Sequence, residues 1–505
     1  MALVSRALPV LAALLIAGCG GDDADSGAGP LDNALGYLPE DAPLVVSIDT
    51  DVEGSQFKAI GKIIDRFPFA NQIEGQLKQQ IESGGGLDYE DDLKPLLGNE
   101  FVVGATDVRS IIDRGGDNDD FIGAIQVKDK GKLEDALEKE KAKEAGEKSG
   151  AKLYEDDDGD AFAIEDDVLV VASSKSKLDA ALEQRDADGR LTEETFDKAT
   201  EGLPKEALLR VYGDLQKLIA SDPETADARK VKWVNALRTF GVTASFKEDA
   251  IDVDFKLGTD GGDLAEEDLP FASGDASPSV LDLPSEIGAG LRNPAQVLRF
   301  GESAAQAVNP TGYADYRTAR TTLERQLDVD IDDDLIAQLE GAMSVTVSTS
   351  GDVGARIELE DEAAFARTLA KVEKELPAII SGAGDSPAKL TKRGDFRELS
   401  SADGDRVVYG VVDGALVLAN DLPRAQRVAR EEPKAVEGTK GALVVNADAE
   451  RLFLEALRSR GSSLPGGGLG QALGGGLIAA PLGRLTGSAS SAKDGITGNL
   501  RLTFD

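Results

Sequence analysis

The chain contains no histidine and a single cysteine, Cys19, in 505 residues. Without an imidazole base or a second thiol, the sequence excludes Ser-His-Asp triads, Cys-His pairs and zinc sites built from histidine and cysteine. No intramolecular disulfide can form, so the folded parts depend on hydrophobic cores. Hydrophobic residues make up 41% of the chain, which is enough material for two or more such cores.

Aromatic residues and positive charges are also scarce. Phe, Trp and Tyr together make up 5% of the chain, with Trp233 the only tryptophan, and 55 basic residues face 93 acidic ones, giving a formal net charge of −38. Such a surface repels nucleic acid, so no nucleic-acid partner is expected, and most of the carboxylates are interpreted as a solvated exterior. The sequence points to no catalytic residue and no cofactor.

The N-terminus has the parts of a secretory signal. Arg6 precedes an apolar segment, Ala7 to Ala17, that is too short to cross a bilayer as a helix. The following Ile16-Ala17-Gly18-Cys19 resembles the bacterial lipobox. The resemblance implies cleavage between Gly18 and Cys19 and a diacylglyceryl group on the Cys19 thiol. The alternative is an ordinary signal peptide whose cysteine merely lies near the cut.

We therefore expect residues 1–18 to be a lipoprotein signal peptide and residues 19–36 to be a flexible tether. Gly20 to Pro30 contains no apolar residue larger than alanine and cannot collapse. Two acyl chains are sufficient for stable anchoring. The expected location is the cell membrane, with the protein lipid-anchored and facing outside the cytoplasm, and the membrane itself is the partner held by the lipid on Cys19.

A series of features occurs twice along the chain, 232–247 residues apart. Asp91-Asp92-Leu93 matches Asp333-Asp334-Leu335, and each is followed by an alternating strand. One further pair of matching segments, Val168–Ala172 and Ala415–Ala419, consists of unbroken apolar strands. Each of these ends in a helix-start signal, Ser173-Ser174 or Asn420-Asp421.

Turns and helices repeat in the same order. Asp158-Gly159-Asp160 and Asp403-Gly404-Asp405 predict hairpin turns, followed by second turns at Asp166-Asp167 and Asp413-Gly414. One helix in each half has apolar residues four apart, Leu133 and Leu137 or Phe365 and Leu369. Each half closes with a long hairpin, turning at 247–249 or 493–495.

The repetition predicts an α+β protein of two tandem related domains, each a mainly antiparallel sheet with helices packed on one side. The boundaries are 37–260 and 281–505, joined by a linker at 261–280. The alternation in Ile357-Glu358-Leu359-Glu360 indicates a sheet with one face in water.

Several of these segments resemble a known bacterial family. Tyr37-Leu38-Pro39-Glu40-Asp41-Ala42-Pro43, the strand that follows it, and Asp92 to Glu100 are similar to the domain of unknown function 3352, as is the segment from Leu203-Pro204 to Asp214. The likeness covers most of the chain beyond the signal. The family implies no reaction, cofactor or catalytic residue.

Two segments require a choice between a site and a plain loop. Asp156, Asp158 and Asp160 are calcium candidates because hard cations bind clustered carboxylates, but Tyr154 occupies the first position of an EF-hand loop, so a hairpin turn is favoured. The glycine-rich Gly461 to Gly476 lacks the Lys-Ser or Lys-Thr of a phosphate loop. It is interpreted as a disordered linker, with a mobile or membrane-touching loop as the alternative.

Two apolar groups are interpreted as core. Phe57, Ile60, Ile63, Ile64 and Phe67 form one helical stripe, and Trp233 lies beside Val234. The alternative interpretation is that the apolar stripe lines a groove for a ligand.

Three function classes remain open. The favoured one is a non-enzymatic binding or scaffolding lipoprotein of the cell envelope, whose protein partner or ligand is unknown. The others are a carrier of a hydrophobic ligand held between sheet and helices, and a carboxylate-based hydrolase.

Overall fold

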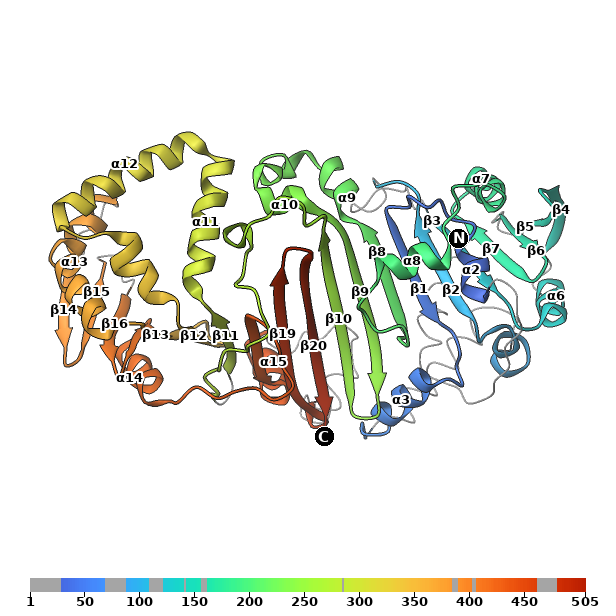
Figure 1. Ribbon diagram of the computed structural model, residues 1–505. Helices are drawn as coiled ribbons and strands as arrows, with labels where there is room; N and C mark the ends of the chain where they lie inside the picture. The colour runs from blue at the N-terminus through green and yellow to red at the C-terminus, as the bar shows by residue number, and fades with distance from the viewer. Residues whose placement is uncertain are drawn as a thin grey trace. The chain divides into compact units, whose positions relative to one another are not determined.

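The computed structural model describes residues 29–68, 88–108, 121–139, 142–155, 161–283, 286–383, 389–401, 406–460 and 479–505 (Figure 1). The chain divides into two compact units. Unit 1 comprises Met1–Ala226, Arg238–Gly258 and Thr503–Asp505, and unit 2 comprises Asp227–Leu237 and Thr259–Leu502.

The sheet of unit 1 is antiparallel, with the strand order β10-β9-β8-β1-β2-β3-β7-β6-β5-β4. Its strands are β1 (Leu44–Asp49), β2 (Glu100–Ala105), β3 (Phe121–Gln126), β4 (Lys143–Lys148), β5 (Ala151–Glu155), β6 (Ala161–Glu165), β7 (Val168–Ala172), β8 (Leu209–Asp214), β9 (Leu237–Lys247) and β10 (Ala250–Thr259).

Hydrophobic cores cover both faces of this sheet. On one face, Val45, Val102 and Val170 pack against α2 (Pro30–Leu35), α7 (Lys175–Arg185) and α8 (Glu193–Ala199). On the other, Phe101 and Ile125 pack against α6 (Lys130–Lys139) and the short helix η3 (Lys94–Leu96), which follows the π-helical turn η2 (Tyr89–Leu93). The prediction of helices on one side only is therefore wrong for unit 1, because apolar residues occupy both faces of its central strands.

The predicted tether is also wrong at its C-terminal end. Pro30–Leu35 forms α2, and Leu31, Ala34 and Leu35 are buried in the core of unit 1. Their spacing of three and four places them on one helical face. Residues 19–28 of the tether, together with Gly18 and the signal peptide, lie outside the described residues.

The sheet of unit 2 is antiparallel, with the strand order β20-β19-β18-β11-β12-β13-β17-β16-β15-β14. Its strands are β11 (Glu286–Arg292), β12 (Ala342–Ser348), β13 (Val353–Glu358), β14 (Lys389–Arg393), β15 (Phe396–Ser400), β16 (Arg406–Val412), β17 (Ala415–Ala419), β18 (Leu443–Asp448), β19 (Leu482–Ala492) and β20 (Gly495–Phe504).

One face of this sheet carries α14 (Leu422–Arg430), whose Ala425 and Val428 pack on Val417 and Ala419. The segment expected to be a linker, 261–280, is packed as well: Leu264, Leu269 and Val280 are buried. The chain just after it lies directly on β11, where a Cβ on Gly288 would stand 2.4 Å from the carbonyl oxygen of Leu281. Glycine is required there because any side chain would displace the crossing segment.

The remaining helices are α3 (Ser55–Ile64), α9 (Leu215–Ser221) and α10 (Lys232–Ala236), then α11 (Pro294–Val308), α12 (Pro310–Leu327), α13 (Glu362–Ala383) and α15 (Ala449–Arg460), with short helical turns at η4 (Pro223–Thr225), η5 (Ala228–Lys230), η6 (Glu266–Asp268), η7 (Asp332–Ile336) and η8 (Ala337–Leu339).

Several local predictions are confirmed. Ser174 and Asp421 are the N-caps of α7 and α14, each accepting a hydrogen bond from the backbone N–H three residues later. The turns after β6 and β16 have Asp166 and Asp413 at φ of 53° and 49°, the left-handed region that such hairpins require. The turns predicted at Asp158–Asp160 and Asp403–Asp405 lie outside the described residues.

Candidate functional site

Two asparagine-proline steps create a helical hairpin in unit 2. Asn293 caps α11 by accepting a hydrogen bond from the Gln296 N–H (3.1 Å), and Asn309 ends α11 and caps α12 through the Gly312 N–H (3.0 Å). A proline follows each asparagine at the first helical position, where its missing N–H costs nothing. The sequence therefore ends one helix and starts the next within two residues, and α11 and α12 contact each other.

The facing sides of α11 and α12 line an open groove of about 660 Å³. From α11 come Val297, Leu298, Gly301, Ala305 and Val308, whose spacing places them on one side of the helix. From α12 come Gly312, Tyr313 and Tyr316, and Ile336 of η7 completes the apolar lining.

The apolar side chains of the groove face water. Leu298 is 45% exposed and Tyr316 is 46% exposed. Isolated exposed apolar residues are common on protein surfaces, but these belong to one continuous lining of a concave surface. The groove therefore has the character of a binding surface for an apolar molecule.

A polar cluster closes one part of the groove. Glu302 Oε1 accepts hydrogen bonds from the Tyr316 hydroxyl (2.9 Å) and from Arg320 Nη1 (2.8 Å). The Arg320 side chain is 2% exposed and also forms ion pairs with Glu324 (3.0 Å) and Asp332 (2.6 Å). Burial and the hydrogen bond to Glu302 raise the pKa of Tyr316, so its hydroxyl remains a donor at neutral pH.

A second apolar surface of unit 2 lies on its sheet. Ile287, Val347 and Val353 are direct cross-strand neighbours on β11, β12 and β13, and they are 40%, 36% and 43% exposed. Neighbouring Cβ atoms in such a row lie roughly 5 Å apart. They form a continuous apolar strip.

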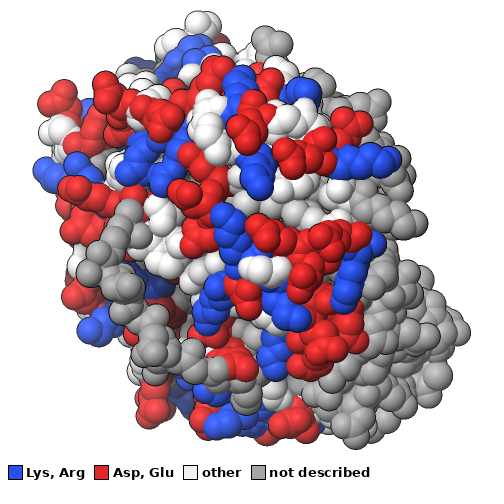
Figure 2. Space-filling model, turned by 90° about the vertical axis from the view of Figure 1, so that its right-hand side faces the viewer, with Lys and Arg blue, Asp and Glu red and all other residues white. Residues whose placement is uncertain are grey.

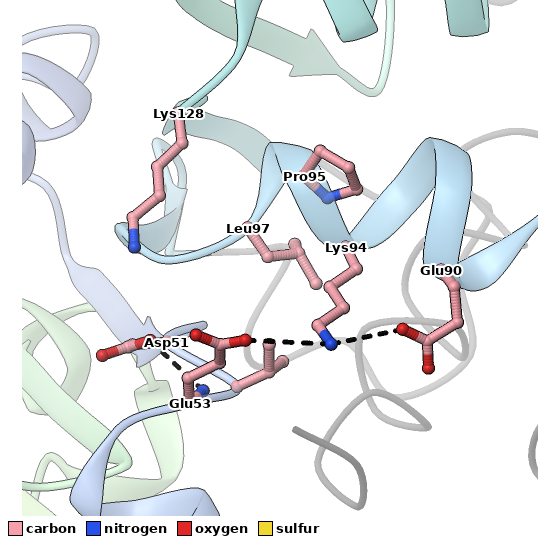
Figure 3. Close-up of a pocket in the computed structure, with 8 residues that line it drawn as sticks. Asp51, Glu53, Glu90, Lys94, Pro95, Leu97 and Lys128 are labelled. Carbon is pink, nitrogen blue, oxygen red and sulfur yellow. Dashed lines mark hydrogen bonds and ion pairs between the residues drawn. The ribbon is translucent and has the colours of Figure 1, made fainter. Parts of the chain in front are cut away.

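Unit 1 contains a pocket of a different kind, of about 460 Å³ (Figure 3). Lys94 Nζ lies between Glu90 (3.2 Å) and Glu53 (3.8 Å). The side chain of Lys128 crosses Gly98, whose φ of 124° and lack of a Cβ permit this close approach, and its ammonium points into the pocket. Because its charges largely compensate one another, this pocket is a less selective candidate than the groove.

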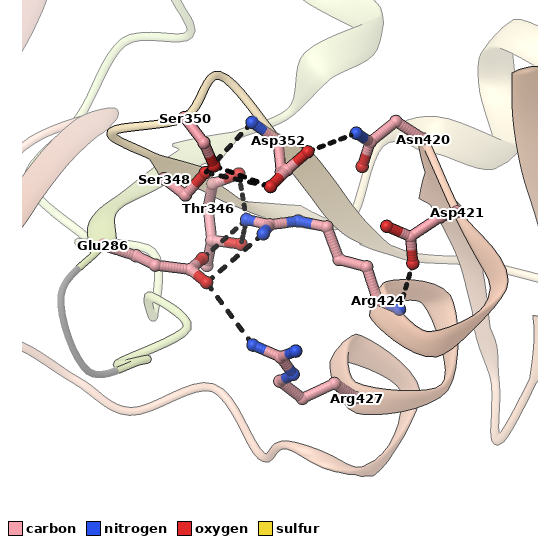
Figure 4. Close-up of polar contacts among 9 residues, drawn as sticks. All are labelled: Glu286, Thr346, Ser348, Ser350, Asp352, Asn420, Asp421, Arg424 and Arg427. Atoms are coloured by element: carbon pink, nitrogen blue, oxygen red, sulfur yellow. Dashed lines mark hydrogen bonds and ion pairs between the residues drawn. The ribbon is translucent and has the colours of Figure 1, made fainter. Parts of the chain in front are cut away.

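A buried ion pair fastens α14 to the sheet of unit 2 (Figure 4). Arg424 binds Glu286 through both terminal nitrogens, at 2.6 and 3.3 Å, and both side chains are at most 6% exposed. The same guanidinium donates to the Thr346 hydroxyl (2.9 Å). Nearby, hydrogen bonds from Ser350 and Asn420 lower the pKa of Asp352. Enclosed by these contacts, the cluster is structural.

The structure describes only some of the residues that the sequence analysis selected as candidates. Cys19, the calcium candidates Asp156, Asp158 and Asp160, and Gly461 to Gly476 lie outside the described residues. Among the described residues, no group of three acidic side chains could hold a metal ion. Phe57, Ile60 and Ile63 are buried core residues of α3, as predicted, and Trp233 is buried.

Sequence reasoning missed the groove itself. The two Asn-Pro steps and the helical spacing of Val297, Gly301, Ala305 and Val308 were available as signals. That the facing sides form an open groove is a long-range property, which neither helix shows alone.

In the described part of the chain, no helix is both long enough and apolar enough to span a membrane.

No curated protein matches the sequence. Among solved structures, crystal form III of TP0453 is similar over 46% of this chain and 82% of its own, with 9% identity and a TM-score of 0.25. Crystal form I is similar over 48% of this chain and 82% of its own, with 12% identity and a TM-score of 0.25. Similarity at this TM-score supports no conclusion about fold or function.

The family comparison is more extensive. Residues 3–375 match the family model described as "Protein of unknown function (DUF3352)". That range covers most of the chain, including the segments around Pro39 and Gly98 in which the resemblance was recognised. The chain belongs to the DUF3352 family.

Proposed function

We propose that the protein is a non-enzymatic binding protein of the cell envelope, anchored through a lipid on Cys19, and that it holds an apolar ligand in the groove between α11 and α12. The groove is the observation that supports this proposal. Its volume of about 660 Å³ is within the range of ligand pockets, and its lining is mainly apolar with a small number of polar groups at one place.

We also propose that the two units are tandem related domains. Their sheets have the same order of strands, with β11 in the place of β1 and β20 in the place of β10. The helix after the first strand differs between them: α3 buries Phe57, Ile60 and Ile63, whereas α11 leaves Leu298 exposed. Ligand binding would then be a specialisation of the second copy.

Filling the groove tests the proposal. A Cβ on Gly301 would meet no atom within 4 Å, so Gly301→Phe adds a large side chain to the groove with little strain on the helix. The neutral fluorophore N-phenyl-1-naphthylamine should bind the parent protein saturably, and we expect the substitution to weaken this binding at least tenfold.

Gly61 provides the matched control. It also lies in a helix, α3, and a Cβ there likewise meets nothing within 4 Å. Gly61→Phe should bind the fluorophore as the parent does. Absence of saturable binding to the parent, or equal binding by Gly301→Phe, would overturn the proposal.

A further inference from the structure

The polar part of the groove has an excess of negative charge. The lining contains one ionisable acidic or basic residue, Glu302, and no lysine or arginine. Behind it, Arg320 is shared among three carboxylates, those of Glu302, Glu324 and Asp332. The formal charges of these four groups do not cancel, so the groove disfavours an anion at this place and favours a cation.

Glu302 retains an unused oxygen. Both hydrogen bonds to its carboxylate go to Oε1, and Oε2 accepts none from any residue that the structure describes. The side chain is 24% exposed, so a ligand can reach it without breaking the ion pair with Arg320.

Two aromatic rings lie in the same lining. The ring centroids of Tyr313 and Tyr316 are 5.7 Å apart, with an angle of 39° between the ring planes. The face of a tyrosine ring attracts ammonium groups, and aromatic residues together with a carboxylate are the usual receptors for substituted ammonium ions. The apolar remainder of the groove accommodates a hydrocarbon chain.

Resting on the proposed function, we infer that the ligand is a lipophilic cation: an apolar chain that carries a substituted ammonium group. The chain lies along Val297, Gly301 and Ala305. The ammonium group lies between the tyrosine rings and Glu302 Oε2. Nothing in this arrangement depends on the overall acidity of the protein, because the selective groups belong to the groove.

Two probes with the same chain separate charge from apolarity. Decyltrimethylammonium, kept below its micelle concentration, and neutral decanol are titrated against bound N-phenyl-1-naphthylamine at 150 mM salt. We expect the cation to bind about tenfold more tightly than decanol. Glu302→Gln and Tyr313→Leu should each reduce the cation affinity several-fold, and each should reduce it by a larger factor than the decanol affinity, so that the preference for the cation is lost.

Asp315→Asn is the matched control for Glu302→Gln. Glu302 lies on α11 and Asp315 on the neighbouring helix α12, outside the groove lining, and the substitution of Asp315 removes the same charge. Its binding of decyltrimethylammonium should equal that of the parent. An equal loss in Asp315→Asn and Glu302→Gln would show diffuse attraction to an acidic surface and would overturn the inference.

The outcomes distinguish this inference from the proposed function. If decanol binds, Gly301→Phe abolishes its binding, and the cation shows no preference, the groove is a binding site but the ligand is not a cation. If neither probe responds to Gly301→Phe, both proposals fail. In Glu302→Gln the amide oxygen can still accept a hydrogen bond from Arg320, and Tyr313→Leu alters no ion pair. The two variants therefore both test recognition of the ammonium group, one through the carboxylate and the other through an aromatic ring.

Discussion

Asp49, at the end of β1, is a carboxyl group whose titration bears on stability. Burial raises its pKa to about 6, and the nearby charges of Asp51 and Glu100 add to this, against an opposing hydrogen bond from the Asp51 N–H. The unfolded value is about 4. Between pH 4 and 6 the unfolded state therefore binds fewer protons at this site than the folded state, and the contribution of Asp49 to stability falls as the pH rises.

We predict that Asp49→Asn stabilises the protein at pH 7.5. The amide oxygen can still accept the hydrogen bond from the Asp51 N–H, at 2.8 Å, while the buried charge is removed. After allowance for solvent screening, we expect the free energy of unfolding to rise by about 1–2 kcal/mol at pH 7.5, and this increase should vanish near pH 4. Urea unfolding of parent and variant at both pH values measures it. An equal increase in the free energy of unfolding at both pH values would show that removal of the Asp49 charge does not cause the stabilisation.

At the scale of the element, α14 is attached to its sheet by a buried charge. Arg424→Met would leave Glu286 largely buried without its main partner, so we predict a loss of about 3–5 kcal/mol in the free energy of unfolding, measured by urea denaturation. Replacing both residues, in Glu286→Leu with Arg424→Met, should recover most of that loss, because no unpaired buried charge remains.

Arg427 is a matched control on the same helix. It lies 3.7 Å from the same carboxylate, but its side chain is 57% exposed. Arg427→Met should cost less than about 1 kcal/mol, as expected for an ion pair in water. Similar losses in Arg424→Met and Arg427→Met would contradict the assignment of the buried pair as the fastening contact.

Elements with a strong local signal were predictable from the sequence. Unbroken apolar runs identified β7 and β17, and Ser174 and Asp421 marked the helices that follow. The expectation of one wet sheet face rested partly on Ile357 to Glu360, but β13 ends at Glu358, and the Glu360 N–H donates to Gln338 outside the strand. Which faces of a sheet are covered by helices, and whether α11 and α12 form a groove, depend on contacts between residues distant in the sequence. A local sequence pattern does not predict such contacts.

For the whole molecule, 93 acidic residues against 55 basic ones produce a negative potential. On the face shown in Figure 2, lysine and arginine side chains are interspersed among the carboxylates. Such exposed pairs contribute little to stability, but the excess charge raises the local concentration of every cation at low salt. Affinity for a cation is therefore informative only near physiological salt and against a charge-matched variant.

The position of the molecule in the cell is expected to depend on one atom, the sulfur of Cys19. We predict that Cys19→Ser moves the protein from the membrane to the aqueous fraction, because serine cannot receive the thioether-linked lipid that supplies the anchoring energy. Fractionation after a high-salt wash measures this and removes molecules held only by charge. Gly21→Ser, two residues away, should remain with the membrane. If the Cys19→Ser variant still partitions with membranes, another part of the chain holds it there; if the parent itself is released, Cys19 merely lies near the cleavage site of an ordinary signal peptide.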